Sequence, residues 1–175
     1  MFYESRARRF ERVVMPHVAA AYNLARWLLG NVQDAEDVMQ EASLRAFRHL
    51  DRLQGDECRA WFFTIVRHEC YDWHRKARAG IGLLPLEDDS PELPCEEHNP
   101  ERMALQRVDE EILREGVEAL PLEFREVFVL RELEDLAYKD IARITDTPIG
   151  TVMSRIARGR KRLQAWLVER QGKEF

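Results

Sequence analysis

Residues 80–100 limit how this chain can fold more than any other segment, because helix-breaking and acidic residues collect there. The segment reads GIGLLPLEDDSPELPCEEHNP and contains four of the seven prolines in the chain, but no lysine or arginine. A stretch of this composition has little intrinsic order and is typical of a solvated tether between folded units. We therefore expect two small domains, at residues 1–79 and 100–175, joined by an acidic linker at residues 80–99.

On both sides of this segment the apolar residues recur with helical spacing, and there is no strong strand-like alternation or Asn-Gly hairpin signal. Pro121 is placed to open a helix with Glu123 in its first turn, whereas Gly30 and Gly55 are placed to end helices. The sequence predicts an all-α fold of two small helical domains. The expected helices span residues 4–29, 33–53, 58–78, 100–119, 121–133, 138–145 and 149–168.

The charge of the chain is acidic on average but unevenly distributed. It carries 27 Lys and Arg residues against 32 Asp and Glu residues, a formal net charge of −5. That average argues against nonspecific binding to nucleic acid. However, the acidic residues are concentrated in the linker and the second expected helix, whereas the third and the last expected helices are basic. Binding of nucleic acid by those two helices therefore remains open.

No run of about 18 apolar residues indicates a membrane span, and the charged segment 1–12 lacks the apolar part of a signal peptide. Cys58, Cys70 and Cys95 are an odd number of cysteines and too few for a disulfide framework. We expect a cytoplasmic protein with reduced thiols and no insertion into a membrane.

The second expected helix has an apolar stripe and an opposite, polar face. The stripe consists of Ala35, Val38, Met39, Ala42, Ala46, Leu50 and Leu53. The opposite face consists of Asp37, Gln40, Glu41, Leu44 and Arg48. One exposed leucine needs no explanation, but an apolar side chain rimmed by polar groups is also typical of a protein interface.

The third expected helix is apolar and aromatic on one side and basic on the other. We expect a core of Phe62, Phe63, Val66, Cys70, Trp73 and Ala77. The other side carries Thr64, Arg67, His68, Tyr71, Asp72, Arg75, Lys76 and Arg78, with Trp61 and Ile65 at the border. Cations interleaved with an aromatic ring suit single-stranded nucleic acid, since cations contact phosphates and rings stack on bases. A solvated helix face is the alternative.

A metal site built from His68, Cys70 and His74 is disfavoured by helix geometry. Cys70 points about 160° away from His68 on the helical wheel, because each residue advances about 100° around an α-helix. His68-Glu69 also lacks the second histidine of an H-E-x-x-H motif. Cys95 and His98 form an isolated pair in the linker, for which redox or metal sensing is a weaker hypothesis. We expect neither a metal nor another cofactor.

Residues 136–167 predict a helix-turn-helix. A short helix with Ile141, Ala142 and Ile144 inward precedes a turn at residues 146–148. Val152, Ile156, Leu163 and Leu167 form the apolar stripe of the next helix. Its other face carries Thr151, Ser154, Arg155, Arg158, Lys161 and Arg162. Small polar and arginine side chains at the first turns of such a helix are the pattern of a DNA recognition helix. An ordinary basic amphipathic helix pair is the alternative.

Together these segments resemble the bacterial extracytoplasmic-function (ECF, group 4) sigma factors of the sigma-70 family. YNLARWLLGNVQDAEDVMQEASLRAF, with its D-A-E-D-x-x-Q-E segment, resembles the polymerase-binding part of the sigma-2 domain. CRAWFFTIVRHECYDWHRKAR is similar to the helix that melts promoters and reads the −10 element. LPLEFREVFVLRELEDLAYKDIARITDTPIGTVMSRIARGRKRL resembles the sigma-4 domain, which reads the −35 element.

The resemblance implies a non-enzymatic subunit that binds core RNA polymerase and directs it to −35/−10 promoters. Its partners would be the β′ clamp helices, the β flap, promoter DNA and an anti-sigma factor in a stress or envelope response, with no small-molecule substrate. The polar face around Leu44 would bind the clamp. The face from Thr64 to Arg78 would hold the −10 strand with a base flipped out, and the loop from Leu53 to Arg59 would help form the base pocket. The −35 contacts would come from the basic face of the recognition helix, with Ala157 able to contact a thymine methyl group.

Two other classes of function remain to be weighed. A helix-turn-helix regulator that does not form holoenzyme would leave the Leu44 face and the aromatic, basic third helix unexplained. An enzyme is not supported, because the sequence has no glycine-rich phosphate loop, nucleophile elbow or dense cluster of carboxylates and histidines.

Overall fold

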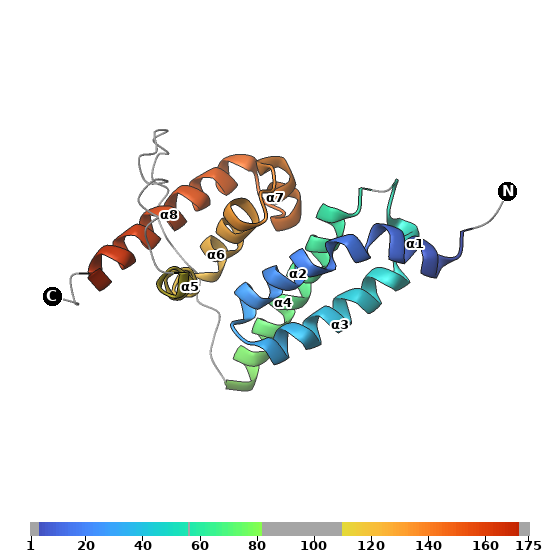
Figure 1. Cartoon of the computed structure of the whole chain (residues 1–175), viewed down its shortest axis with the longest axis horizontal. Coiled ribbons are helices and arrows are strands. Elements are labelled where there is room, and N and C mark those ends of the chain that lie inside the picture. The colour runs from blue at the N-terminus through green and yellow to red at the C-terminus, as the bar shows by residue number, and fades with distance from the viewer. Residues whose placement is uncertain (1–3, 56, 82–109, 172–175) are drawn as a thin grey trace.

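The computed structural model describes residues 4–55, 57–81 and 110–171, and within them the predicted all-α fold is confirmed. These residues form eight α-helices and no strand (Figure 1). Most of the expected linker, including Cys95 and His98, lies outside the described residues, as does the first part of the helix expected at 100–119.

The N-terminal half contains α1 (Arg6–Val13), α2 (Met15–Leu29), α3 (Val32–Arg48) and α4 (Arg59–Ile81). The prediction of one helix over residues 4–29 is wrong, because the helix is interrupted at Val14, between α1 and α2. Pro16 explains the break, since proline has no N–H to donate to the carbonyl of Arg12. The helix expected at 33–53 is also shorter and ends as a 3₁₀ turn, η1 (Leu50–Arg52).

Local signals at the α2–α3 junction account for its sharp turn. Gly30 adopts a left-handed conformation with φ 81° and caps α2 by donating its N–H to the carbonyl of Arg26. Asn31 then caps α3, because its side-chain oxygen accepts a 2.8 Å hydrogen bond from the backbone N–H of Asp34. The two helices therefore pack side by side, and α4 packs against both.

The C-terminal half contains α5 (Glu110–Glu118), α6 (Leu122–Phe128), α7 (Tyr138–Thr145) and α8 (Ile149–Gln171). Pro121 opens α6 as predicted, but the helix expected at 121–133 changes after Phe128 to a π-helical turn, η4 (Val129–Leu133). The predicted helix-turn-helix is confirmed as α7 and α8. Asp146 makes the turn in a left-handed conformation with φ 51°, which an aspartate tolerates better than most residues.

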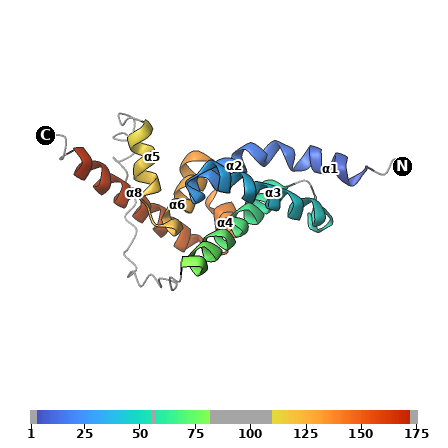
Figure 2. The same cartoon turned by 90° about the horizontal axis from the view of Figure 1, so that it is seen from below.

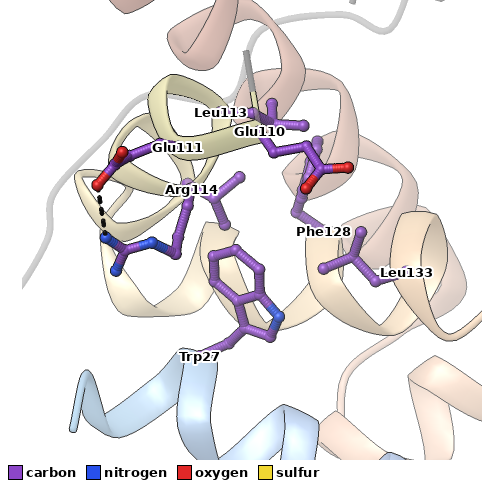
Figure 3. A pocket seen from close by; sticks show the side chains of 8 residues that line it. Trp27, Glu110, Glu111, Leu113, Arg114, Phe128 and Leu133 are labelled. Atoms are coloured by element: carbon purple, nitrogen blue, oxygen red, sulfur yellow. Dashed lines mark ion pairs between the residues drawn. The ribbon is translucent and has the colours of Figure 1, made fainter. Parts of the chain in front are cut away.

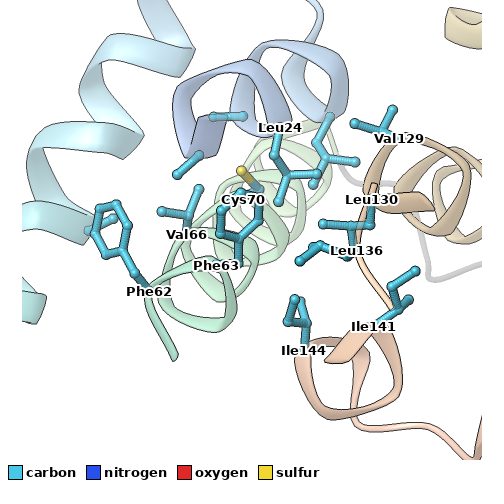
Figure 4. Close-up of a cluster of buried hydrophobic side chains, with 14 of the residues drawn as sticks. Leu24, Phe62, Phe63, Val66, Cys70, Val129, Leu130, Leu136, Ile141 and Ile144 are labelled. Carbon is cyan, nitrogen blue, oxygen red and sulfur yellow. The ribbon is translucent and has the colours of Figure 1, made fainter. Parts of the chain in front are cut away.

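The apolar stripes of α3, α4, α7 and α8 lie in one continuous core that crosses both halves. Trp73 and Ala142 are only partly buried against this core, and the prediction that Ala77 belongs to it is wrong. Phe63 of α4 and Leu24 of α2 lie together with Leu130, Leu136 and Ile144 of the C-terminal half, all of them buried (Figure 4). In two perpendicular views the halves lie against each other, with α1 and α8 pointing to opposite ends of the molecule (Figures 1 and 2).

Among the helices described, none has both the length and the apolar character needed to cross a membrane.

Candidate nucleic-acid and protein interfaces

The polar face of α3 is solvent-exposed and surrounds one apolar side chain. Leu44 is 49% exposed. Its neighbours on this face are also exposed: Asp37, Gln40, Glu41 and Arg48. We call these five residues the α3 surface. The opposite stripe of α3 is buried in the core, so the helix is fixed with this surface outward.

Sequence reasoning missed Phe47, which extends the apolar part of this face. Its ring is 37% exposed and packs edge-on against Phe10 of α1 at 5.5 Å between ring centroids. The signal was available, because residues three apart are neighbours on a helix and Phe47 follows Leu44 by three. Leu44 and Phe47 together expose a larger apolar surface than a single leucine would.

The basic side of α4 divides into an exposed part and a covered part. His68, Arg75, Lys76 and Arg78 are exposed, and Arg75 pairs with Asp72. Trp61, Thr64 and Asp72 are partly buried, and the Thr64 hydroxyl donates a 2.7 Å hydrogen bond to the carbonyl of Ala60.

Arg67 and Tyr71, in the covered part, contact the C-terminal half. The Arg67 guanidinium donates two hydrogen bonds to the carboxylate of Glu126 in α6, at 2.7 and 3.2 Å. Burial acts to lower the pKa of Arg67, but the hydrogen bonds and charge of Glu126 outweigh it, and the pKa is raised. Burial, together with the charge of Glu126, also raises the pKa of Tyr71.

Arginine side chains make hydrogen bonds at both ends of the loop between η1 and α4. Leu53 is 6% exposed, so its side chain lies in the core and only its backbone faces the loop. Arg9 of α1 donates to the carbonyls of Leu53 at 3.0 Å and Gly55 at 3.4 Å. At the other end, Arg59 donates to the carbonyl of Glu134 at 2.6 Å. Arg9 therefore holds the loop backbone at Leu53 and Gly55, and Arg59 links the start of α4 to the C-terminal half.

The candidate −35 residues lie along α8 but not all on one face. Lys161 and Arg162 are exposed, while Thr151, Ser154, Ala157 and Arg158 are partly buried. Arg155 forms a 3.2 Å ion pair with Glu123 of α6, and the Arg162 guanidinium lies over the Phe124 ring at 4.7 Å. These two arginines thus border α6, whereas Ser154, Ala157 and Lys161 lie opposite the apolar stripe.

A groove of about 630 Å³ lies where the two halves meet (Figure 3). Trp27 of α2 contributes one wall, and residues of α5, α6 and η4 contribute the rest. The apolar lining is Trp27, Leu113, Val117, Phe128 and Leu133, and the charged lining is Glu110, Glu111 and Arg114. The groove exists only while both halves are packed together, because its walls come from both.

The three residues weighed for a metal site lie in different environments. His68 is exposed, and Cys70 is fully buried. His74 places its Nε2 2.7 Å from the carbonyl of Leu28. Within the described ranges, no three His, Cys, Asp or Glu side chains are arranged to hold a metal ion.

Residues 13–80 match the family model of sigma-70 region 2, and residues 110–163 match that of sigma-70 region 4. The chain belongs to the ECF sigma factors of the sigma-70 family. It is 34% identical over 160 residues to the ECF RNA polymerase sigma factor SigE of Mycolicibacterium smegmatis. The aligned region covers 91% of this chain and 62% of that protein. It is also 34% identical over 135 residues to the ECF RNA polymerase sigma-E factor of Escherichia coli K12, covering 73% of this chain and 71% of that one.

Two solved structures show a similar arrangement of helices. One is the sigma factor RpoE in complex with the anti-sigma factor NepR from Bartonella quintana, with 27% identity and a TM-score of 0.71 over 90% of this chain and 96% of that one. The other is CnrH in complex with the cytosolic domain of CnrY, with 25% identity and a TM-score of 0.64 over 91% and 88% of the two chains. The architecture of this sigma factor is thus shared with two proteins whose structures were solved in complex with another protein.

Proposed function

We propose that this ECF sigma factor is a non-enzymatic subunit that binds core RNA polymerase and directs it to −35/−10 promoters. The observation that carries the proposal is the order of the two family matches on one chain, region 2 and then region 4. Residues 1–79 and 100–175 would act as the two promoter-reading units, with residues 80–99 as the linker between them. A helix-turn-helix regulator without polymerase would have no use for region 2.

The α3 surface would bind the clamp helices of the polymerase β′ subunit, and the C-terminal half would contact the β flap. An exposed Leu44 with polar neighbours supports this role, because an apolar centre with a polar rim is the usual anatomy of a protein interface. Phe47 would enlarge the apolar centre.

The basic side of α4 would hold the single-stranded −10 element. Its exposed cations, Arg75, Lys76 and Arg78, are placed to contact phosphates, while His68 presents a ring that can donate or accept a hydrogen bond. Flipping a base out of the stack costs a few kcal/mol, which contacts to the base and phosphates would offset. The α8 helix would read the −35 element through Ser154, Ala157 and Arg158.

An anti-sigma factor would hold this sigma factor inactive until a stress or envelope signal releases it. The RpoE structure described above was solved in complex with an anti-sigma factor, and the CnrH structure in complex with the cytosolic domain of CnrY. A partner that filled the groove beside Trp27 would contact both halves at once and favour the packed arrangement.

Reconstitution with core polymerase tests the proposal. The purified chain should form holoenzyme and start run-off transcription at one position on a −35/−10 template. Asp37→Lys combined with Leu44→Ala should weaken binding to the core polymerase without loss of folding. Glu11→Lys, an exposed charge reversal on α1 outside the D-A-E-D-x-x-Q-E segment, serves as the control. Sequence-specific DNA binding without holoenzyme formation would instead favour the helix-turn-helix regulator.

A further inference from the structure

Part of the basic side of α4 is unavailable in this structure because the C-terminal half covers it. The Arg67 side chain is 14% exposed, and that of its partner Glu126 is 1% exposed. Glu126 is the only charged residue in the described ranges whose side chain is buried completely within the core. A buried carboxylate of this kind requires its cationic partner, since leaving it unpaired would be strongly unfavourable.

Glu126 occupies the hydrogen-bond donors that Arg67 would offer to DNA. The Arg67 Nε donates to Glu126 Oε2 at 2.7 Å and a second guanidinium nitrogen donates to Oε1 at 3.2 Å. Carboxylates and phosphates fit the same planar fork of an arginine. A DNA phosphate could bind Arg67 in this way only after the Glu126 carboxylate had left.

Tyr71 is engaged by the same contact. The Arg67 guanidinium lies 4.3 Å from the centre of the Tyr71 ring, and the ring itself is partly buried. One face of the ring is therefore covered by a cation. In this arrangement Tyr71 cannot offer that face for stacking on a base.

Further contacts between the halves surround this ion pair. Arg59 of α4 donates to the carbonyl of Glu134 at 2.6 Å, and Arg125 of α6 donates to the carbonyl of Trp27 at 3.2 Å. Beside them Phe63 is fully buried in the core shared with Ile141 and Ile144. The cover over α4 is thus built from apolar packing and specific hydrogen bonds, as an interface is.

We propose that Arg67, Tyr71 and Phe63 form a docking surface on α4 for α6, η4 and α7 of the same chain, and that docking competes with the binding of single-stranded −10 DNA. The proposal deepens the proposed function and rests on it, since it takes α4 as the −10 helix. The packed arrangement is then a closed state. In the free protein it lowers the apparent affinity for the −10 strand in proportion to the small fraction of open molecules.

Binding of a −10 non-template oligonucleotide to the free full-length chain tests this competition. Glu126→Gln removes the charge that holds Arg67 but keeps the size of the side chain. It should raise the affinity measured by fluorescence anisotropy about tenfold, because the closed state loses its charged contact. The matched control is Glu132→Gln, which removes a carboxylate paired with Arg160 inside the C-terminal half and should leave the affinity unchanged. Equal affinities for the wild type and a folded Glu126→Gln variant would overturn the proposal.

A second measurement needs no variant. Saturating oligonucleotide should speed hydrogen exchange in the peptides that cover residues 122–145 of the wild-type chain, because α6, η4 and α7 are displaced from α4. Unchanged or slower exchange in these peptides with the oligonucleotide bound would show that DNA and the C-terminal half do not compete.

Holoenzyme assays separate this proposal from the proposed function. In the holoenzyme the polymerase spaces the two halves, so neither Glu126→Gln nor Glu132→Gln should change the run-off yield more than about twofold. An active wild-type holoenzyme together with an unaffected Glu126→Gln free chain would reject the competition alone. A wild-type chain that forms no holoenzyme would reject the proposed function.

Discussion

Burial decides which side chains of this sigma factor can ionise or react. Cys58 and Cys70 are 1% and 0% exposed, and burial raises the pKa of Cys58 to about 11 and that of Cys70 to about 12. The thiolate is the reactive form of cysteine, so both thiols are expected to be inert. Periodicity had already placed Cys70 in the core of its helix, and the structure confirms that prediction.

Thiol labelling checks the reactivity of the two cysteines in a Cys95→Ser variant. At about pH 8 both thiols should react with a disulfide reagent at least about 100-fold more slowly than free cysteine, because the thiolate fraction is small. Both should react rapidly once the chain is unfolded in urea. Fast labelling of either thiol in the native protein would contradict the burial described above.

His74 makes the stability of the fold depend on pH. Burial lowers its pKa below the usual 6.5, against the raising effect of its hydrogen bond to the Leu28 carbonyl, and the charges of Arg125 and Arg78 lower it further. Below about pH 6.5 the unfolded state then binds more protons than the folded state. The stability contributed by neutral His74 is therefore complete above that pH and is lost as the pH falls towards the folded pKa.

Urea unfolding at about pH 7.5 and about pH 5.5 measures this contribution. The loss of stability on acidification should be smaller in His74→Gln than in the wild type. His17, whose pKa is also lowered by burial and by Arg59, titrates in both proteins and cancels in the comparison. The same loss in both proteins would show that His74 is not held neutral by the fold.

At the scale of helices, the apolar stripes could be predicted from the sequence but several joints could not. The stripes of α3 and α8 follow a helical period, which is why Ala42 and Ile156 were expected inside and are buried. The break at Val14 follows from Pro16, a signal that was present in the sequence but not used. The π-helical turn at η4 has no local signal, since it accommodates packing against helices distant in sequence.

A substitution at Gly116 tests how closely α5 packs on α8. A Cβ atom at this position would lie 2.6 Å from Leu163 Cδ1 and 2.9 Å from Trp166 Cε3, closer than van der Waals contact allows. Gly116→Ala should therefore lower the free energy of unfolding by about 1–3 kcal/mol, as overpacking does. Gly150→Ala is the control in α8, because nothing lies within 4 Å of its Cβ position, and this change should not destabilise the fold. Equal effects would contradict the close approach of the two helices.

A substitution at Arg158 tests the proposed role of α8 in reading the −35 element. Arg158→Ala should weaken holoenzyme binding to its −35 sequence by about 1–3 kcal/mol and relax the preference for that sequence if it reads a base. Arg160→Ala, in the same helix, removes an arginine that pairs with Glu132 and should leave the preference unchanged. Competition binding with matched and scrambled −35 duplexes measures both. A uniform loss across sequences for Arg158→Ala would assign it to a phosphate instead.

At the scale of the whole molecule, the sequence predicted two helical units but not their contact. Arg67 and Tyr71 were expected on an open DNA-binding face, and no local pattern relates them to Glu126, which lies beyond the acidic linker. The contact depends on the three-dimensional fit of two separate units. In the packed arrangement the C-terminal half covers part of the basic side of α4. Under the proposed function, this part would be closed to DNA until the halves separate.

A distance across the two halves tests this account most directly. Spin labels replace the exposed residues Glu36 of α3 and Gln164 of α8, in a chain that also carries Cys95→Ser. We expect a single short distance between the labels in the free sigma factor and a longer one in the holoenzyme bound to a −35/−10 promoter. The same distance in both states, with transcription active, would contradict the claim that the halves must separate to read a promoter.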